Sequence, residues 1–191
     1  MHTCVWAGAI LALSMWPQAE EPATKLEKFM LRKNLLLIKE TRLIGAVPGL
    51  EGTEVRVEAV ALSAPSERER VYGVRLVRPV AGKDATGSEG IIDFDEIASF
   101  QEALDHMLRA ASEAKPPDPS SPASGSITEL AISTRGGVRC ALVQTGRQFT
   151  GRLQVRGTAE EAGISFGIGA LGRLRSLLGQ ARERLVALGA N

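Results

Sequence analysis

The sequence predicts an α+β protein made of two tandem β4α units, in which each short antiparallel sheet is covered by one amphipathic helix. Three observations support this fold class. A Pro- and Ser-rich segment divides the chain, alternating apolar strands precede one helical stripe on each side of it, and 191 residues suit one mid-sized domain or two small ones. Because neither sheet alone buries much surface, we expect the two units to pack into a single body.

The N-terminal segment, residues 1–19, has the features of a signal peptide. Val5–Trp16 is a 12-residue run without charge, too short to span a bilayer as a relaxed helix but suited to the apolar region of an export signal. Ala19 offers a small residue at a plausible cleavage point, although no Lys or Arg precedes the run. We therefore expect a secreted or periplasmic protein; a buried N-terminal helix or a misplaced start codon is the alternative.

The first unit is assigned to residues 20–113. Its four expected strands are Asn34–Val47, Glu54–Leu62, Val71–Pro79 and Gly90–Phe94. The second strand alternates strictly, which places Val55, Val57, Ala59 and Ala61 on one face. A helix follows from about Asp95, with an apolar stripe formed by Ile97, Phe100, Leu104, Met107 and Ala111.

A linker and a second unit repeat this order. Ala114–Ser126 contains four Pro, four Ser and one Gly in 13 residues and no large apolar side chain, as expected of an exposed linker. The second unit, residues 127–191, has expected strands at Ile127–Thr134, Val138–Gln144, Phe149–Arg156 and Gly163–Phe166. Its helix carries an apolar stripe of Leu171, Leu174, Leu178, Ala181, Leu185 and Leu188, and the recurrence favours a duplication.

Two segments carry a resemblance to known proteins. Gly90–Leu108 and Ile127–Arg139, together with the Leu-rich C-terminal helix, resemble a group of exported bacterial proteins with tandem sheet-then-helix repeats. That resemblance implies export and a β4α architecture but no chemistry. In strand order alone, the pattern is also similar to Whirly and PUR-type single-stranded nucleic-acid binders, and a shared fold does not carry function.

Composition argues against several chemistries. The chain is 44% apolar and 24% charged, which excludes a disordered chain and a multi-span membrane protein. Its two Cys and two His are too few for a zinc cluster or a disulfide scaffold, and we expect no cofactor and no bound metal. A GxGxxG match at Gly167, Gly169 and Gly172 leaves too little chain behind it for a dinucleotide-binding unit.

The candidate reactive side chains have structural explanations. Asp93, Asp95 and Glu96 could act as paired carboxylates or bind a hard cation, but Asp95 is better explained as a helix cap and Asp93 as a solvent-facing strand residue. His106 is expected at the surface of the first helix, and Cys140 as a small apolar core residue. No catalytic residue is therefore assigned.

Charge points to one candidate binding surface. From Ser126 onward there are nine Arg, no Lys and four Glu, whereas the first 125 residues carry 14 basic and 18 acidic groups. Arg152 and Arg156 share a strand face, Arg139 is expected to join them from the neighbouring strand, and such a surface suits carboxylate or phosphate.

These features favour a secreted or periplasmic, non-enzymatic binding or accessory protein. An anionic ligand or a protein partner would use Arg139, Arg152 and Arg156. Self-association between the acidic first unit and the basic second unit is equally consistent with the charges, and a solvated polar face without a ligand stays open. The alternative function is single-stranded nucleic-acid binding by a Whirly-like architecture, which requires a cytoplasmic chain; a hydrolase ranks third because no nucleophile, base and oxyanion donor can be assembled.

Overall fold

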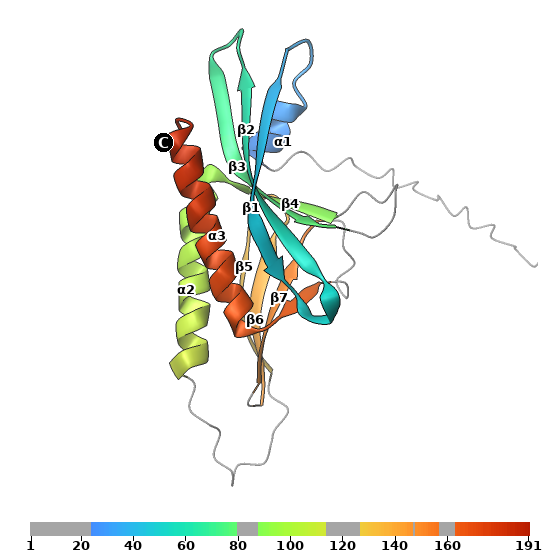
Figure 1. Ribbon diagram of the computed structural model, residues 1–191, viewed down its shortest axis with the longest axis vertical. Helices are drawn as coiled ribbons and strands as arrows, with labels where there is room; N and C mark the ends of the chain where they lie inside the picture. The colour runs from blue at the N-terminus through green and yellow to red at the C-terminus, as the bar shows by residue number, and fades with distance from the viewer. Residues whose placement is uncertain (1–23, 80–87, 114–126, 147, 157–162) are drawn as a thin grey trace, which may run out of the picture.

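The computed structural model describes residues 24–79, 88–113, 127–146, 148–156 and 163–191. The expected signal peptide at residues 1–19 and the expected linker at residues 114–126 lie outside this part of the chain. Within it, the two units follow each other in sequence as two groups of strands that each end in a helix (Figure 1).

The first unit opens with a short helix that the sequence pattern had not indicated. Its elements are α1 (Lys25–Met30), β1 (Ile38–Pro48), the 3-10 turn η1 (Leu50–Gly52), β2 (Glu54–Ala64), β3 (Glu69–Arg78), β4 (Ser88–Asp93), the 3-10 turn η2 (Phe94–Glu96) and α2 (Ile97–Glu113). The second unit contains β5 (Ile127–Ser133), β6 (Arg139–Thr145), β7 (Gln148–Gln154), β8 (Ile164–Phe166) and α3 (Ile168–Ala187).

Both sheets are antiparallel and four-stranded, with orders β1-β2-β3-β4 and β5-β6-β7-β8. Because each strand pairs with its neighbour in sequence, the connections are hairpin-like and the register follows the alternation of apolar residues. The predicted α+β fold class with two β4α units is therefore confirmed. The first strand begins at Ile38 rather than at Asn34, and Phe94 belongs to η2 rather than to a strand.

Helix α3 packs on both sheets. It lies beside α2 and against β1, β2 and β3 of the first sheet as well as β7 of the second (Figure 1). A Cβ added at Gly45 of β1 would lie 2.7 Å from Leu177 Cδ2, and one added at Gly151 of β7 would lie 3.2 Å from Leu171 Cγ. The sequence pattern predicted a helix for each sheet; the structure adds that α3 also covers the sheet of the other unit.

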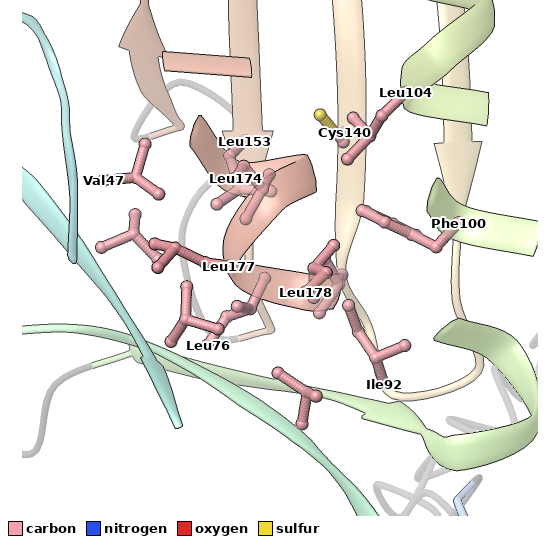
Figure 2. Packing of buried hydrophobic residues seen from close by; sticks show 14 of the residues in the cluster. Val47, Leu76, Ile92, Phe100, Leu104, Cys140, Leu153, Leu174, Leu177 and Leu178 are labelled. Carbon is pink, nitrogen blue, oxygen red and sulfur yellow. The ribbon is translucent and has the colours of Figure 1, made fainter. Parts of the chain in front are cut away.

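One hydrophobic cluster joins the two units. It combines Leu76 and Ile92 of the first sheet and Phe100 of α2 with Cys140 and Leu153 of the second sheet, and α3 inserts among them (Figure 2). The predicted stripes are confirmed except at their last positions: Ile97, Phe100, Leu104 and Met107 of α2, and Leu171, Leu174, Leu178, Ala181 and Leu185 of α3 are buried. The last predicted residue of each stripe, Ala111 and Leu188, is only half-buried. Burial of these side chains from both units in one cluster means that the two sheets share their main core.

A smaller cluster lies on the other side of the first sheet. Helix α1 packs Leu26 and Phe29 against Val60 and Leu62 of β2. The expected alternation of β2 is therefore correct for Val55, Val57 and Ala59, which are buried in the main cluster. Ala61 lies on the same face, as expected, because the pairing of β2 with β3 is unbroken there. It is only half-buried, however, because the covered face changes where α1 replaces α3 as the packing partner.

The shared core predicts the effect of truncating one α3 side chain. Leu174 is fully buried between the two sheets, so Leu174→Ala should lower the free energy of unfolding by about 2–5 kcal/mol. Because both units use the same core, chemical denaturation followed by far-UV circular dichroism should still show one cooperative transition. The control is Val186→Ala on the same helix, where the side chain is 48% exposed. Two separate transitions in the Leu174→Ala protein would contradict a common core.

Candidate functional site

The three arginines singled out from the sequence lie on the outer face of the second sheet. Arg139 of β6 pairs in register with Gln154 of β7, and Arg152 of β7 pairs with Ala141. Directly opposed residues of antiparallel strands project to the same side, so these arginines share a face, and the pattern of exposure places Arg156 there as well. The intervening residues Cys140 and Leu153 point into the core. The expected shared face is thus present.

The arginines differ in their partners. Arg139 forms an ion pair with Glu129 of β5, with Nη2 and Oε1 2.6 Å apart. Arg156 reaches across to Glu27 of α1 and also donates to the Arg135 carbonyl oxygen at 3.3 Å. Arg152 has no carboxylate partner among the described residues. It is therefore the arginine of this face that can bind an anionic ligand without first breaking an ion pair with one of these residues.

The cross-strand neighbours of Arg152 are short. It lies between Ala141 on β6 and Ser165 on β8, and neither neighbour is long enough to cover the guanidinium group. The helices pack on the opposite side of the sheet, where Phe166 and Leu171 approach Gly151. A planar, permanently charged guanidinium at an exposed strand position can bind a carboxylate or phosphate through two parallel hydrogen bonds.

Aromatic side chains are missing from the described part of this face. Phe149 and Phe166 both pack toward the core, and Phe166 is 1% exposed. Binding of single strands depends on aromatic platforms on which bases stack, so charge and aromatic rings are separated here. The arrangement fits an isolated anionic group better than a run of bases.

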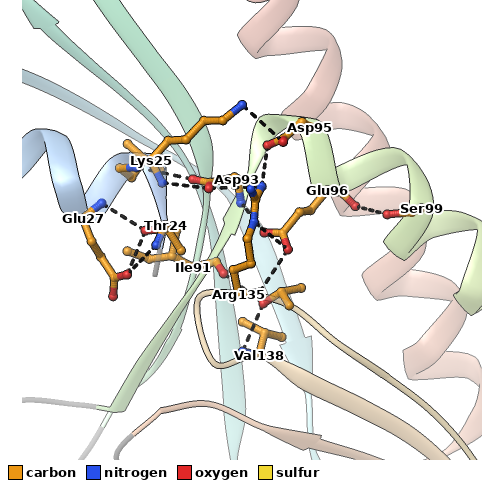
Figure 3. A network of polar contacts seen from close by, with 12 residues as sticks. Thr24, Lys25, Glu27, Ile91, Asp93, Asp95, Glu96, Ser99, Arg135 and Val138 are labelled. Carbon is orange, nitrogen blue, oxygen red and sulfur yellow. Dashed lines mark hydrogen bonds and ion pairs between the residues drawn. The ribbon is translucent and has the colours of Figure 1, made fainter. Parts of the chain in front are cut away.

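The acidic cluster has a different role from the one expected. Asp93 was predicted to face solvent, but its side chain is fully buried, and it occupies the N-terminal capping position of η2 in place of Asp95. It accepts hydrogen bonds from the backbone amides of Lys25 at 2.8 Å and Leu26 at 3.4 Å (Figure 3). The prediction was wrong because α1 packs over the end of β4, and no local pattern around Asp93 signals that contact.

Arg135 links all three carboxylates of this cluster. Its Nη2 lies 3.3 Å from Asp93 Oδ2 and 2.8 Å from Asp95 Oδ1, and its backbone amide donates to Glu96 at 3.0 Å (Figure 3). Burial raises the pKa of Asp93, against the opposing effect of the two amides and the guanidinium charge. Partial burial also opposes ionisation of Asp95, but Arg135 and Lys25 outweigh it, so the pKa of Asp95 lies below its usual value.

These contacts make the cluster structural. Each carboxylate is already bound by amides or by a guanidinium group, which leaves no pair free to exchange protons with a substrate or to coordinate a cation. The described residues contain no group of three or more His, Cys, Asp and Glu side chains able to hold a metal ion.

The remaining candidates have the expected positions. The side chain of His106 is 64% exposed on α2, with Nδ1 3.0 Å from Arg109 Nη2. Cys140 is fully buried on β6, where desolvation raises the pKa of its thiol to about 12. Gly167, from the GxGxxG match, is simply the residue that precedes α3. The thiol is therefore inert, and the imidazole lies apart from it.

Sequence reasoning overlooked Arg135 and helix α1. Arg135 lies in a turn that docks on β4: Ile91 donates to the Gly136 carbonyl oxygen at 3.2 Å, and a Cβ at Gly136 would lie 2.1 Å from the Ile91 oxygen. The adjacent glycines signal a turn, but not the strand that it contacts. Helix α1 does carry a local signal, the capping box formed by Thr24 and Glu27.

Replacing Arg135 should destabilise the folded protein, because the buried carboxylate of Asp93 then lacks a positively charged partner. In an Arg135→Gln protein, Asp93 loses its counter-charge, and we expect the free energy of unfolding at neutral pH to fall by about 2 kcal/mol. Arg135 lowers the folded-state pKa of Asp93, so its loss raises that pKa further. At pH values above the folded-state pKa of Asp93 in the variant, Asp93 is charged and the full loss of stability is expected. As the pH falls through that pKa, Asp93 becomes neutral and the loss of stability shrinks.

Denaturant unfolding at several pH values measures this effect. The matched control is Arg139→Gln, which breaks an exposed ion pair on the same sheet and should cost less than about 1 kcal/mol. An Arg135→Gln penalty that is small, or that does not change with pH, would show that Arg135 does not stabilise the buried charge.

Neither a protein-family model nor a curated protein matches this chain. Among the helices of the described residues, none is long and apolar enough to cross a membrane.

Proposed function

We propose that this chain is a non-enzymatic binding or accessory protein that recognises an anionic group of a protein partner through the outer face of its second sheet. The observation that carries the proposal is the set of three exposed arginines on one sheet face, of which Arg152 lacks a carboxylate partner among the described residues. Arg139, opposite Gln154, and Arg156 lie further along the same face and contribute positive potential while they hold their own partners.

Two further features support binding rather than catalysis. The buried thiol of Cys140 and the exposed imidazole of His106 lie apart, and Asp93, Asp95 and Glu96 are bound by α1 and Arg135. An acidic protein segment is favoured over nucleic acid because Phe149 and Phe166 pack away from the arginines. Carboxylates bound in this way would be released by salt, since exposed charges are screened within about 10 Å at 0.1 M.

Charge reversal at Arg152 tests the site. Fluorescence anisotropy at low salt would measure binding of a labelled polyglutamate peptide, and Arg152→Glu should weaken it at least about tenfold, because a charge-assisted contact becomes a repulsion. Arg182→Glu on α3 is the matched control, since this exposed arginine has no carboxylate partner among the described residues and lies off the sheet. It should retain affinity within about twofold of the original.

Two results would contradict the assignment. Equal losses of peptide affinity in Arg152→Glu and Arg182→Glu would mean that binding depends on the net charge of the protein and not on the position of Arg152. A labelled single-stranded DNA of the same length that binds more tightly than the peptide, and that loses affinity in Arg152→Glu, would replace the protein partner by nucleic acid as the ligand of this face.

We also propose that the protein acts outside the cytoplasm. The support is the apolar run Val5–Trp16 followed by Ala19, as in a cleavable export signal. Expressed at full length in a bacterial host, the chain should be recovered outside the cytoplasm with a new N-terminus between about Ser14 and Glu21. Leu11→Arg, which interrupts the apolar run, should keep it inside and uncleaved. An intact N-terminus on cytoplasmic protein from the unaltered sequence would disprove export.

A further inference from the structure

The outer half of strand β1 is an unprotected sheet edge. β1 is the terminal strand of the first sheet, and all six residues from Ile38 to Leu43 are exposed on both faces (Figure 1, where β1 is blue). No other described strand pairs with its free side. Edge strands of this kind present unpaired amides and carbonyls that can hydrogen-bond to another strand.

The inner half of β1 is protected, which limits the open edge to that segment. A register shift occurs between Leu43 and Gly45, and Leu177 packs on Gly45. Arg173 of α3 donates its Nε proton to the Ala46 carbonyl oxygen at 2.7 Å. The bulge and the arginine stop strand pairing beyond Leu43, so an added strand can extend over Ile38–Leu43 but no further.

One face of the open segment carries two opposite charges that have no ion-pair partner among the described residues. Glu40 and Arg42 project to the same side of β1, and neither forms an ion pair with another described residue. Their neighbours in register on β2 are Ala61 and Ala59, which have no charge and leave space beside them. With Arg184 and Leu188 of the C-terminal end of α3, they border a shallow hollow at this edge.

We propose that Ile38–Leu43 pairs antiparallel with the same segment of a second copy of this chain, with Thr41 opposite the partner's Thr41. In an isologous pair, the two-fold axis lies perpendicular to the sheet and keeps every side chain on its own face. Centred on Thr41, this arrangement places Glu40 opposite the partner's Arg42 and Arg42 opposite the partner's Glu40. The interface then contains two ion pairs between Glu40 of one copy and Arg42 of the other, and each charge has one partner.

The charges also reject the neighbouring registers. A pair centred on Lys39, Glu40 or Arg42 would place that charged residue opposite its own copy, and like charges directly opposed across strands are destabilising. The Thr41 register has no such pair. It also places Leu43, which is 58% exposed, opposite the partner's Lys39, whose aliphatic stem can cover it. The charges on Ile38–Leu43 thus favour the Thr41-centred register over its neighbours. They also favour a closed dimer over the addition of further strands.

Charge swapping on the full-length chain tests this pairing. Sedimentation equilibrium should show a monomer–dimer equilibrium for the unaltered protein. Glu40→Arg or Arg42→Glu alone should raise the dimer dissociation constant at least about tenfold, since each creates two like-charge pairs. The double variant Glu40→Arg, Arg42→Glu restores opposite charges in the same register and should bring the constant back to within about threefold of the original.

The controls separate pairing from folding and from net charge. Both altered residues are exposed, so the thermal unfolding of the variants should match that of the original at concentrations where all are monomeric. Arg182→Glu changes the net charge as Arg42→Glu does but should leave the dimer intact. A protein that stays monomeric at all soluble concentrations would overturn the proposal. So would a dimer dissociation constant that is unchanged by the single charge reversals, or one that is not restored in the double variant.

Discussion

The apolar stripe of helix α3 is the constraint on which the rest of this structure depends. Leu177 packs on the first sheet at Gly45, while Leu171 packs on the second at Gly151, so one helix covers surface that two separate helices would otherwise have to cover. A small four-stranded sheet has too little apolar surface to be stable alone. Because both sheets pack on α3, the two units form one main core. The sheet surfaces that α3 does not cover are those that can bind other molecules.

A second junction is polar and holds the units at the other end of the core. There the buried carboxylate of Asp93 is bound by the first amides of α1 and by Arg135 from the turn between β5 and β6. A buried charge is tolerated only with such partners, and these come from two parts of the chain that are distant from Asp93 in sequence. Residues that looked like candidates for acid–base chemistry are thus used to fix the relative position of α1, β4 and the second sheet.

The two surfaces proposed for binding consist of exposed residues. The outer face of the second sheet carries Arg152 beside short neighbours, and the outer half of β1 exposes backbone and the opposite charges of Glu40 and Arg42. Flat surfaces suit recognition of another chain, whereas catalysis needs convergent groups in a site that excludes water. Both proposals, an anionic partner on one surface and a second copy on the other, follow from this distribution.

Strand alternation and helical stripes reflect which side chains must leave water, so the sequence predicts both β4α units, the buried faces of α2 and α3, the core position of Cys140 and the shared face of Arg139 and Arg152. Helix α1 was not predicted, although Thr24 and Glu27 form a capping box at its start. The coverage of both sheets by α3, the burial of Asp93 and its ion pair with Arg135 appear only in the folded chain. These contacts join residues 40 or more positions apart, and they depend on how whole elements dock, which local periodicity does not encode.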